Sequence, residues 1–258
     1  MNMRNDAAGA ALPDCAGLVG VLGGMGPLAT VDFMHKVLLA TPVSRDQDHV
    51  PMIVSCIPQV PDRTAAFCGD GESPLAAMTT CGRRLVAAGA QMVLMPCNTA
   101  HLWYDEIQAA LQVPMLHLVD AAVEAVAQLA TEHDRIGLLA TDATLASGLY
   151  VNRQPRDGRP VRWLLPTARE MSAYVMPGIE AVKAGQIGFG STLLTTAAHA
   201  LVRRGAAAVV MGCTEIPLAL DADRAGCPVV DATAALARRA VQWSTAQRGS
   251  AAAPAESA

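Results

Sequence analysis

The sequence predicts an α/β fold of two similar lobes, each a parallel sheet flanked by helices, with the functional site in the cleft between them. Three observations lead to this prediction: the composition, an alternation of short apolar runs with helical stretches, and an internal repeat. Of the 258 residues, 52% are hydrophobic and only 3% are aromatic. Such a composition is typical of strands buried on both faces beneath closely packed helices.

Short apolar runs bounded by Gly, Pro or Asp predict the strands, and longer stretches predict the crossover helices that parallel strands need. The predicted strands are Gly17–Leu22, Met52–Ile57, Met92–Met95, Met115–Leu118, Ile136–Ala140, Val161–Leu165, Ala207–Met211 and Val229–Val230. The predicted helices are Ala29–Ala40, Pro74–Ala88, Trp103–Leu111, Ala121–Glu132, Ala168–Ala184 and Ser191–Arg204.

An internal repeat relates the two halves of the chain. Residues 85–97 align without gaps on residues 201–213, with seven identical positions at a shift of 116. Residues 19–22 match residues 136–139 at a shift of 117. Because two separate segments agree on nearly one shift, the sequence predicts two lobes of the same design.

Each copy of the repeat ends on a cysteine, Cys97 or Cys213, directly after a predicted strand. The carboxyl ends of parallel strands face the crevice where α/β proteins bind ligands, so we expect the two thiols to face one cleft. Polar residues follow both cysteines, whereas a buried core would continue with apolar ones. Two acid/base groups on opposite sides of a substrate are what inversion of a carbon centre by proton transfer requires.

The other five cysteines, at positions 15, 56, 68, 81 and 227, are expected to be ordinary small apolar residues. The total is odd, and no CxxC pair or His at metal-ligand spacing is present. The spacing therefore predicts neither a disulfide framework nor a metal site.

Charge and hydropathy exclude several kinds of partner. The net charge is −4 and no basic run is longer than an arginine pair, so we expect no nucleic-acid partner. Because no apolar run reaches 18 residues and the N-terminus lacks the apolar core of a signal peptide, we expect no membrane association and a cytoplasmic location. We expect a first lobe of residues 16–114 plus 227–243, a second lobe of 115–226, and flexible tails at 1–15 and 244–258.

Four motifs in order around the repeat resemble the aspartate racemase branch of the aspartate/glutamate racemase superfamily. They are Gly23-Gly24-Met25-Gly26-Pro27-Leu28-Ala29-Thr30, Pro61-Asp62-Arg63-Thr64-Ala65, Pro96-Cys97-Asn98-Thr99-Ala100-His101 and Gly212-Cys213-Thr214-Glu215. The resemblance covers about Leu18 to Ala235. It implies two α/β lobes, a homodimer, and a cofactor-independent racemase that moves a proton between two thiols on a small acidic amino acid.

Carried over by position, the resemblance makes Cys97 and Cys213 the proton donors and acceptors. It implies further that the residues around them bind the substrate. These are Met25, Arg63, Asn98, Thr99, Ala100, Lys183, Thr214 and Glu215. The physical interpretation agrees for Arg63, because a guanidinium in a proline-bounded turn is able to grip a carboxylate in a bidentate fork. Lys183 and Glu215 have structural alternatives, charge pairing at a helix C-terminus and helix capping.

The sequence departs from the glutamate racemases at two places. Those enzymes carry Asp-Ser after the first strand and a His after the second Cys-Thr, where this chain has Met25-Gly26 and Glu215. Aspartate is therefore the favoured substrate, and glutamate or broader specificity stays open. Glutamate racemases, maleate isomerases, decarboxylases and hydantoin racemases share the scaffold and are the nearest alternatives.

Two hypotheses lie outside that superfamily. The segment Gly24-Met25-Gly26-Pro27-Leu28-Ala29 satisfies GxGxxA after a strand, the pattern of a nicotinamide-binding oxidoreductase. The next predicted strand does not end in the acidic residue that would bind the ribose, and the paired cysteines would have no role. A non-enzymatic ligand-binding protein on the same scaffold predicts affinity without turnover.

Overall fold

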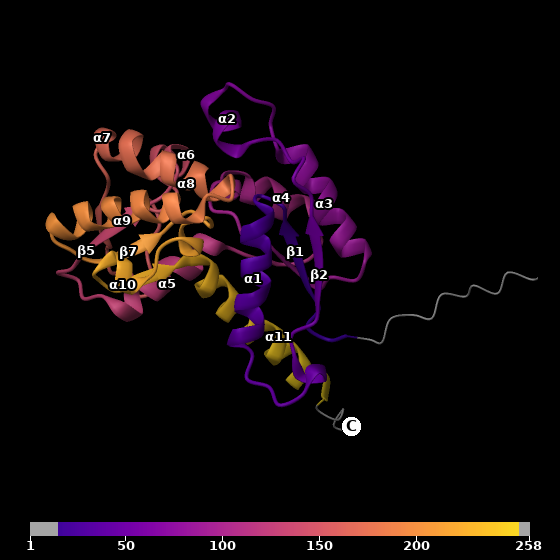
Figure 1. The fold of residues 1–258 in the computed structure, drawn as a ribbon. Coiled ribbons are helices and arrows are strands. Elements are labelled where there is room, and N and C mark those ends of the chain that lie inside the picture. The colour runs from indigo at the N-terminus through magenta and orange to yellow at the C-terminus, as the bar shows by residue number, and fades with distance from the viewer. Residues whose placement is uncertain (1–14, 253–258) are drawn as a thin grey trace, which may run out of the picture.

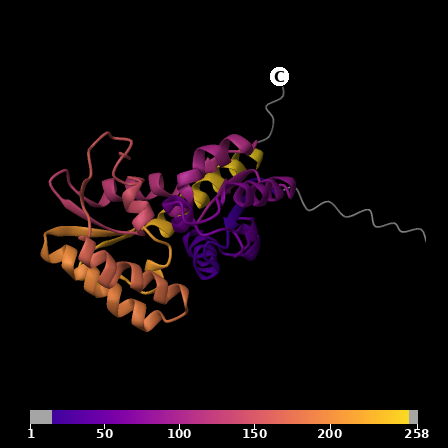
Figure 2. The same cartoon turned by 90° about the horizontal axis from the view of Figure 1, so that it is seen from above.

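A computed structural model describes residues 15–252, which form two four-stranded parallel sheets in two lobes (Figures 1 and 2). The strand order is β2-β1-β3-β4 in the first sheet and β6-β5-β7-β8 in the second. The strands are β1 (Val19–Gly23), β2 (Met52–Cys56), β3 (Met92–Leu94), β4 (Met115–Leu116), β5 (Arg135–Leu139), β6 (Arg162–Leu164), β7 (Ala206–Met211) and β8 (Val229–Asp231). The α/β prediction is confirmed, and every predicted strand forms.

Helices connect the strands, as parallel pairing requires. They are α1 (Pro27–Ala40), α2 (Arg63–Cys68), α3 (Leu75–Ala87), α4 (Tyr104–Ala110), α5 (Leu118–Leu129), α6 (Asp142–Ala146), α7 (Ala168–Glu170), α8 (Met176–Lys183), α9 (Ile187–Arg203), α10 (Ala222–Ala225) and α11 (Ala232–Ala252). The predicted helices correspond to α1, α3, α4, α5, α7 with α8, and α9. The short helices α2, α6 and α10 and the last helix, α11, were not expected.

The two sheets are built to the same register. Gly20 on β1 pairs with Val93 on β3, as Gly137 on β5 pairs with Val209 on β7. Both glycines allow the helix before the neighbouring strand, α3 or α9, to pack closely on the sheet. A Cβ added at Gly20 would lie 3.2 Å from Leu85, and a Cβ added at Gly137 would lie 3.0 Å from Leu201. Leu85 and Leu201 occupy equivalent positions of the repeat. The repeat in the sequence therefore corresponds to the same contact between a strand glycine and a helix leucine in both lobes.

Replacing Gly20 by alanine is expected to lower the free energy of unfolding by about 1–3 kcal/mol through overpacking. The new Cβ would lie 2.8 Å from the Cβ of Ala90, a short side chain that cannot rotate away. Gly188→Ala on α9 is the control, because a Cβ there meets nothing within 4 Å. Urea unfolding of both variants measures the difference. Equal or greater stability of Gly20→Ala would show that the sheet and helix relax apart at no cost.

Strand pairing corrects the expected lobe boundaries. Strand β4 pairs with β3, so residues Met115–Leu116 belong to the first sheet, whereas the sequence assigned them to the second lobe. Strand β8 pairs with β7, so Val229–Asp231 belongs to the second sheet, whereas the sequence assigned it to the first lobe. The reason is that the chain leaves each lobe only after its fourth strand is complete.

The expected flexible tail from residue 244 is also corrected, because α11 runs on to Ala252. Tertiary contacts hold this part of the helix. Ser244 is buried and its Oγ donates to the carbonyl oxygen of Gly17 at 2.8 Å. The Arg248 guanidinium donates to the carbonyl oxygens of Asp48 and His49 at 2.7 and 3.2 Å. The remaining tail residues, 1–14 and 253–258, lie outside the described part of the chain.

The largest apolar core lies between the two sheets. It combines β1 and β3 of the first sheet with β5 and β7 of the second, and it includes buried side chains of α1, α5 and α11. Figures 1 and 2 show α11 running from the second lobe back to the first. Separate cores under α3 and α4 in the first lobe and under α8 and α9 in the second cover the outer faces. No helix within residues 15–252 is long and apolar enough to cross a membrane.

Candidate active site

The repeat brings Cys97 and Cys213 to one cavity between the lobes. Cys97 follows β3 and Cys213 follows β7, and each is 6% exposed. The cavity has a volume of about 20 Å³, room for about one water molecule. Its lining residues are Met25, Asp62, Arg63, Thr64, Cys97, Asn98, Thr99, Thr141, Lys183, Cys213, Thr214 and Glu215. The expectation that both thiols face a single cleft is confirmed.

A buried histidine fixes the backbone at Cys97. The amide N–H of Leu118, at the start of α5, donates to His101 Nε2 at 3.0 Å, so Nδ1 carries the ring hydrogen and donates to the carbonyl oxygen of Cys97 at 2.8 Å. Burial lowers the pKa of His101 to about 4, so the ring is neutral at neutral pH. A neutral imidazole is what this pair of hydrogen bonds requires.

A carboxylate holds the other thiol. The Cys213 thiol donates to Glu215 Oε2 at 3.0 Å, and the hydroxyl of Thr214 donates to the same oxygen at 3.3 Å. Burial raises the pKa of the Cys213 thiol well above its ordinary value, and the charge of Glu215 and this hydrogen bond raise it further. The positive charge of Lys183 acts in the opposite direction. The net effect favours the protonated form of the Cys213 thiol.

The pseudo-twofold repeat makes Thr99 the counterpart of Glu215, and both reach across to the opposite lobe. The Thr99 hydroxyl lies 3.0 Å from the hydroxyl oxygens of both Thr141 and Thr144, in the turn after β5. Glu215 Oε1 lies against Gly26, in the turn after β1. A Cβ added at Gly26 would lie 3.1 Å from this oxygen. The two halves thus share a framework but differ in charge beside the thiol.

The glycines of the turn after β1 are explained by packing. Gly24 has φ of +89°, and a Cβ there would lie 2.4 Å from the backbone nitrogen of Ile57. Thr30 on α1 holds the turn by accepting from the N–H of Gly24 at 2.9 Å and donating to the carbonyl oxygen of Gly26 at 2.8 Å. The GxGxxA pattern therefore serves close contact with the next strand and with Glu215.

Asn98 follows Cys97 and is held by a tyrosine from the second lobe. Tyr150 is fully buried, and its hydroxyl donates to Asn98 Oδ1 at 2.5 Å. Burial raises the pKa of the Tyr150 phenol, and the ionised forms of the Cys213 thiol and the Asp231 carboxyl raise it further, so the group stays a donor. Among the described residues Asn98 Nδ2 has no hydrogen-bond partner. This amide is an available donor in the wall of the cavity.

Arg63 is the first residue of α2, and the backbone before that helix fixes its guanidinium. Its Nη1 donates to the carbonyl oxygens of Val60 and Pro61 at 3.2 and 3.0 Å. Asp62 caps α2 by accepting from the N–H of Ala65 at 2.9 Å. Within the described chain the buried Nε of Arg63 has no partner. One edge of the guanidinium is therefore tied down and another remains available to an anion.

Lys183 ends α8 at the entrance to the cavity. Burial lowers its pKa, but the ionised forms of the surrounding thiols and of the Glu215 and Asp62 carboxyls outweigh burial, so the net shift is upward. The lysine therefore stays charged. A wider hollow of about 380 Å³ adjoins the thiol cavity and shares Asp62, Arg63, Lys183 and Glu215 with it. These four charged side chains form the boundary between the hollow and the thiols.

The structure brings together all but one of the residues that the sequence singled out. Ala100 is the exception: it has no exposed surface and packs into the core under α3 and α4, because the helical turn after Cys97 directs it inward. The sequence missed Asp62, Thr64 and Thr141 as lining residues. A signal for Thr141 was present, since it follows the strand equivalent to β1 and occupies the repeat position of Gly24.

Two pseudo-symmetric α/β lobes that present paired thiols to one cavity define a class of protein, the two-lobed racemases. The model of the Asp/Glu/hydantoin racemase family matches residues 22–240, and the chain belongs to this family. The broad-specificity amino-acid racemase RacX of Bacillus subtilis is 28% identical over 87% of this chain and 96% of its own length.

Solved structures agree with this assignment. The Picrophilus torridus aspartate racemase is 29% identical to this chain, with a TM-score of 0.79 over 88% of this chain and 94% of its own. A glutamate racemase from Francisella tularensis, solved with D-glutamate, shares the fold at 15% identity, with a TM-score of 0.63 over 92% of this chain and 84% of its own. The predicted superfamily is therefore confirmed.

Proposed function

We propose that the protein is a cofactor-independent racemase of acidic amino acids that interconverts L- and D-aspartate and uses Cys97 and Cys213 as its two acid/base groups. The observation that carries the proposal is the presence of both thiols, at repeat-equivalent strand ends, in the wall of one cavity. Kinship with an aspartate racemase and with a broad-specificity racemase supports the reaction class. Glutamate is the second substrate we propose.

In the proposed reaction one cysteine, as thiolate, takes the α-proton from one face of the substrate. The opposite cysteine, as thiol, returns a proton to the other face, and the roles exchange for the other enantiomer. We assign the α-carboxylate to the donors beside the thiols, Asn98, Thr99 and Thr214. The charged Lys183 stabilises the negative charge that develops as the α-proton leaves.

We assign the side-chain carboxylate of the substrate to Arg63. Arg63 lines the cavity, and its Nε has no hydrogen-bond partner among the described residues. The backbone already orients the guanidinium, so little side-chain entropy is lost on binding. The cavity of about 20 Å³ is smaller than an amino acid, so binding must widen it. Because Arg63 and Lys183 also border the larger hollow, this boundary is where we expect the widening.

A chiral assay of aspartate, glutamate, alanine and serine in heavy water, with no added cofactor, tests the function. We expect both enantiomers of aspartate to appear from either one, with solvent deuterium at the α-carbon. Binding of aspartate without deuterium incorporation would identify a ligand-binding protein and overturn the proposal. Activity lost on dialysis against EDTA and restored by pyridoxal phosphate or a metal would overturn its cofactor independence.

Glu215→Gln is expected to shift the alkylation of Cys213 to lower pH. The substitution keeps the shape and a hydrogen-bond acceptor but removes the charge that raises the pKa of the Cys213 thiol, so more thiolate is present at a given pH. The measurement is the iodoacetamide rate at Cys213 against pH, by peptide mass spectrometry, in a Cys97→Ser background. Glu170→Gln is the control, since Glu170 pairs with Arg204 at 2.9 Å and lies outside the cavity. Identical profiles for Glu215→Gln and its parent would remove Glu215 from the control of this thiol.

We also propose a homodimer in the cytoplasm. Large apolar side chains are exposed along one face of α1, and such a patch on a soluble protein marks an interaction surface. They are Leu28, Val31, Leu38 and Leu39. All seven cysteines are free, as a reducing compartment would keep them. Light scattering of the purified protein measures the mass in solution.

A further inference from the structure

A second hollow lies on the other side of the Cys97 turn. It has a volume of about 300 Å³ and shares no lining residue with the thiol cavity or with the hollow at its entrance. Its walls come from α4, β4, α5, α11 and the loop before β6, so both lobes contribute. The lining residues are Tyr104, Met115, Leu116, His117, Asp120, Ala121, Glu124, Gln154, Arg156 and Arg239.

Some charged groups of this hollow have ion-pair or hydrogen-bond partners, and one does not. Asp120 pairs with Arg153 at 2.5 Å, and Glu124 Oε1 accepts from the backbone N–H of Arg156 at 2.7 Å. The Arg156 side chain adds a longer ion pair to Glu124, at 3.7 Å. Arg239 on α11 forms no ion pair or side-chain hydrogen bond with any described residue. Two arginines and two carboxylates therefore line the same space. Arg239 is the arginine that has no partner among the described residues, and each carboxylate has lone pairs to spare.

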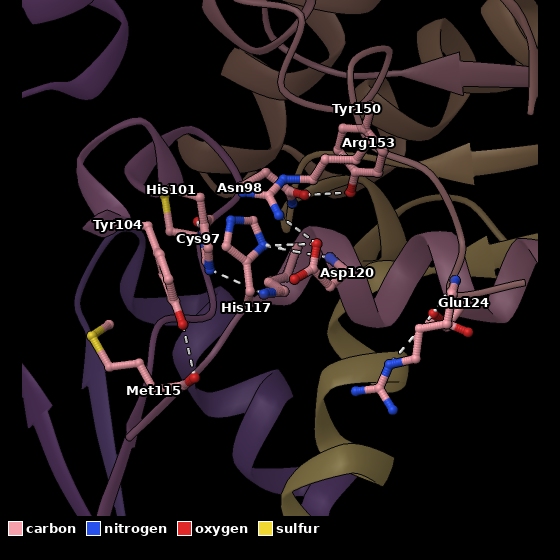
Figure 3. Close-up of polar contacts among 12 residues, drawn as sticks. Cys97, Asn98, His101, Tyr104, Met115, His117, Asp120, Glu124, Tyr150 and Arg153 are labelled. Carbon is pink, nitrogen blue, oxygen red and sulfur yellow. Dashed lines mark hydrogen bonds and ion pairs between the residues drawn. The ribbon is translucent and has the colours of Figure 1, made fainter. Parts of the chain in front are cut away.

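A cluster of three rings lies between these charged groups and Cys97. Figure 3 shows Tyr104, His101 and His117 close together next to Cys97, with Asp120 on the other side of His117. The His117 ring lies 4.5 Å from the rings of both Tyr104 and His101. Its Nε2 is buried and has no hydrogen-bond partner in the described chain. His101 in turn donates to the Cys97 carbonyl at 2.8 Å, so one side chain separates the hollow from the group that positions this thiol.

The pseudo-twofold axis repeats the hollow but not its chemistry. The turn from β8 into α11 has an equivalent hollow, of about 370 Å³, in which Asp231, Ala234 and Arg238 take the places of His117, Asp120 and Glu124. There Asp231 is already paired with Lys36 at 2.6 Å. The fold thus produces a hollow at both places, while the aromatic wall and the two carboxylates occur at one.

We propose that the hollow lined by Tyr104, His117, Asp120, Glu124 and Arg239 is a regulatory site for a free monocarboxylic amino acid. Arg239 takes the α-carboxylate, Asp120 and Glu124 take the ammonium group, and the side chain packs on Tyr104. A zwitterion has one negative and one positive group, which match the unpaired Arg239 and the two carboxylates beside it. The second carboxylate of a dicarboxylic amino acid would instead face Asp120 and Glu124 and be repelled by them. The bound amino acid would contact α11, α5 and the loop of the second lobe at the same time. It would change the position of the Cys97 backbone through the contacts of His117 with His101 and of His101 with the Cys97 carbonyl.

Binding is tested in the Cys97→Ser/Cys213→Ser double variant, which lacks both proposed acid/base groups and so cannot racemise the probe. A negative binding result is then independent of whether the proposed racemase function is correct. The probes are L-phenylalanine and L-leucine, followed by calorimetry. We expect binding that saturating aspartate does not displace. Arg239→Gln should weaken it about 10- to 100-fold, the loss of one charge-assisted contact, and Arg238→Gln in the equivalent hollow should not. Absence of binding at millimolar probe, displacement by aspartate, or equal effects of the two arginine variants would overturn the proposal.

Coupling to the thiol is measured separately. In the Cys213→Ser variant, L-phenylalanine should change the rate at which iodoacetamide alkylates Cys97, and Arg239→Gln should abolish that change. His117→Asn, which removes the ring that contacts His101, should retain binding of the probe and lose the change in alkylation. A Cys97 rate that is unaffected by saturating L-phenylalanine would overturn the regulatory part of the proposal.

Discussion

Replacing either Cys97 or Cys213 by alanine is expected to lower the racemisation of aspartate by at least about 10²–10⁴-fold, the contribution of a positioned acid/base group. The two thiols lie at repeat-equivalent strand ends in one cavity, and inversion needs a proton donor on each face of the α-carbon. Each side chain is small, so the variants should stay folded, as circular dichroism and thermal unfolding check. Chiral chromatography measures the rate.

The two variants should differ in which enantiomer exchanges its α-proton with heavy water. With a single thiol left, exchange is restricted to the face that this thiol serves, so the preferred enantiomer should switch between Cys97→Ala and Cys213→Ala. Cys227→Ala is the control, because Cys227 lies outside the cavity and should leave the rate unchanged. A folded Cys97→Ala or Cys213→Ala protein that racemises aspartate at the parent rate would contradict the two-thiol assignment.

Arg63→Ala is expected to lower kcat/KM for aspartate by roughly 10- to 150-fold, which corresponds to about 1.5–3 kcal/mol for a lost charge-assisted hydrogen bond. Alanine and serine should be affected much less, because they have no side-chain carboxylate. The backbone carbonyls of Val60 and Pro61 fix the guanidinium, so a lysine at this position should not restore the loss. Arg83→Ala, an exposed arginine on α3, is the control. Equal losses for all substrates would show that Arg63 does not contact the distal carboxylate.

The sequence predicted the regular parts of the fold because their signals are local. Apolar runs marked every strand, and the repeat marked two lobes of the same design, which the equivalent pairings of Gly20 with Val93 and of Gly137 with Val209 agree with. The lobe boundaries were misplaced because β4 and β8, of two and three residues, carry no local sign of which sheet they join, although each pairs with the strand directly before it. The continuation of α11 was missed for the same reason: Ser244 and Arg248 are held by residues about 200 positions away.

The site divides in the same way. The cysteines and the polar residues directly after them were predicted, because strand ends and the repeat fix their place. Tyr150, which orients Asn98, acts through a contact between segments that sequence spacing does not relate. The contact of His101 with the Cys97 carbonyl is local, but it depends on the N–H of Leu118, 17 residues on, which fixes the state of the ring. Ala100 was wrongly included, because motif resemblance assigns whole segments, whereas a helical turn alternates between the cavity and the core.

The position of α11 has a consequence for how the chain is made. Leu236, Ala237 and Ala240 of this helix share a core with Phe33 and Val37 of α1, so the inner face of the first lobe is closed by a helix that is synthesised after all eight strands. Domains of a nascent chain generally fold in order from the N-terminus. Here a ribosome that has delivered the first four strands still carries an open apolar surface. The lobe that is translated first is therefore completed only after all strands of the second lobe have been translated, and a chain stopped short of α11 lacks part of the core of both lobes.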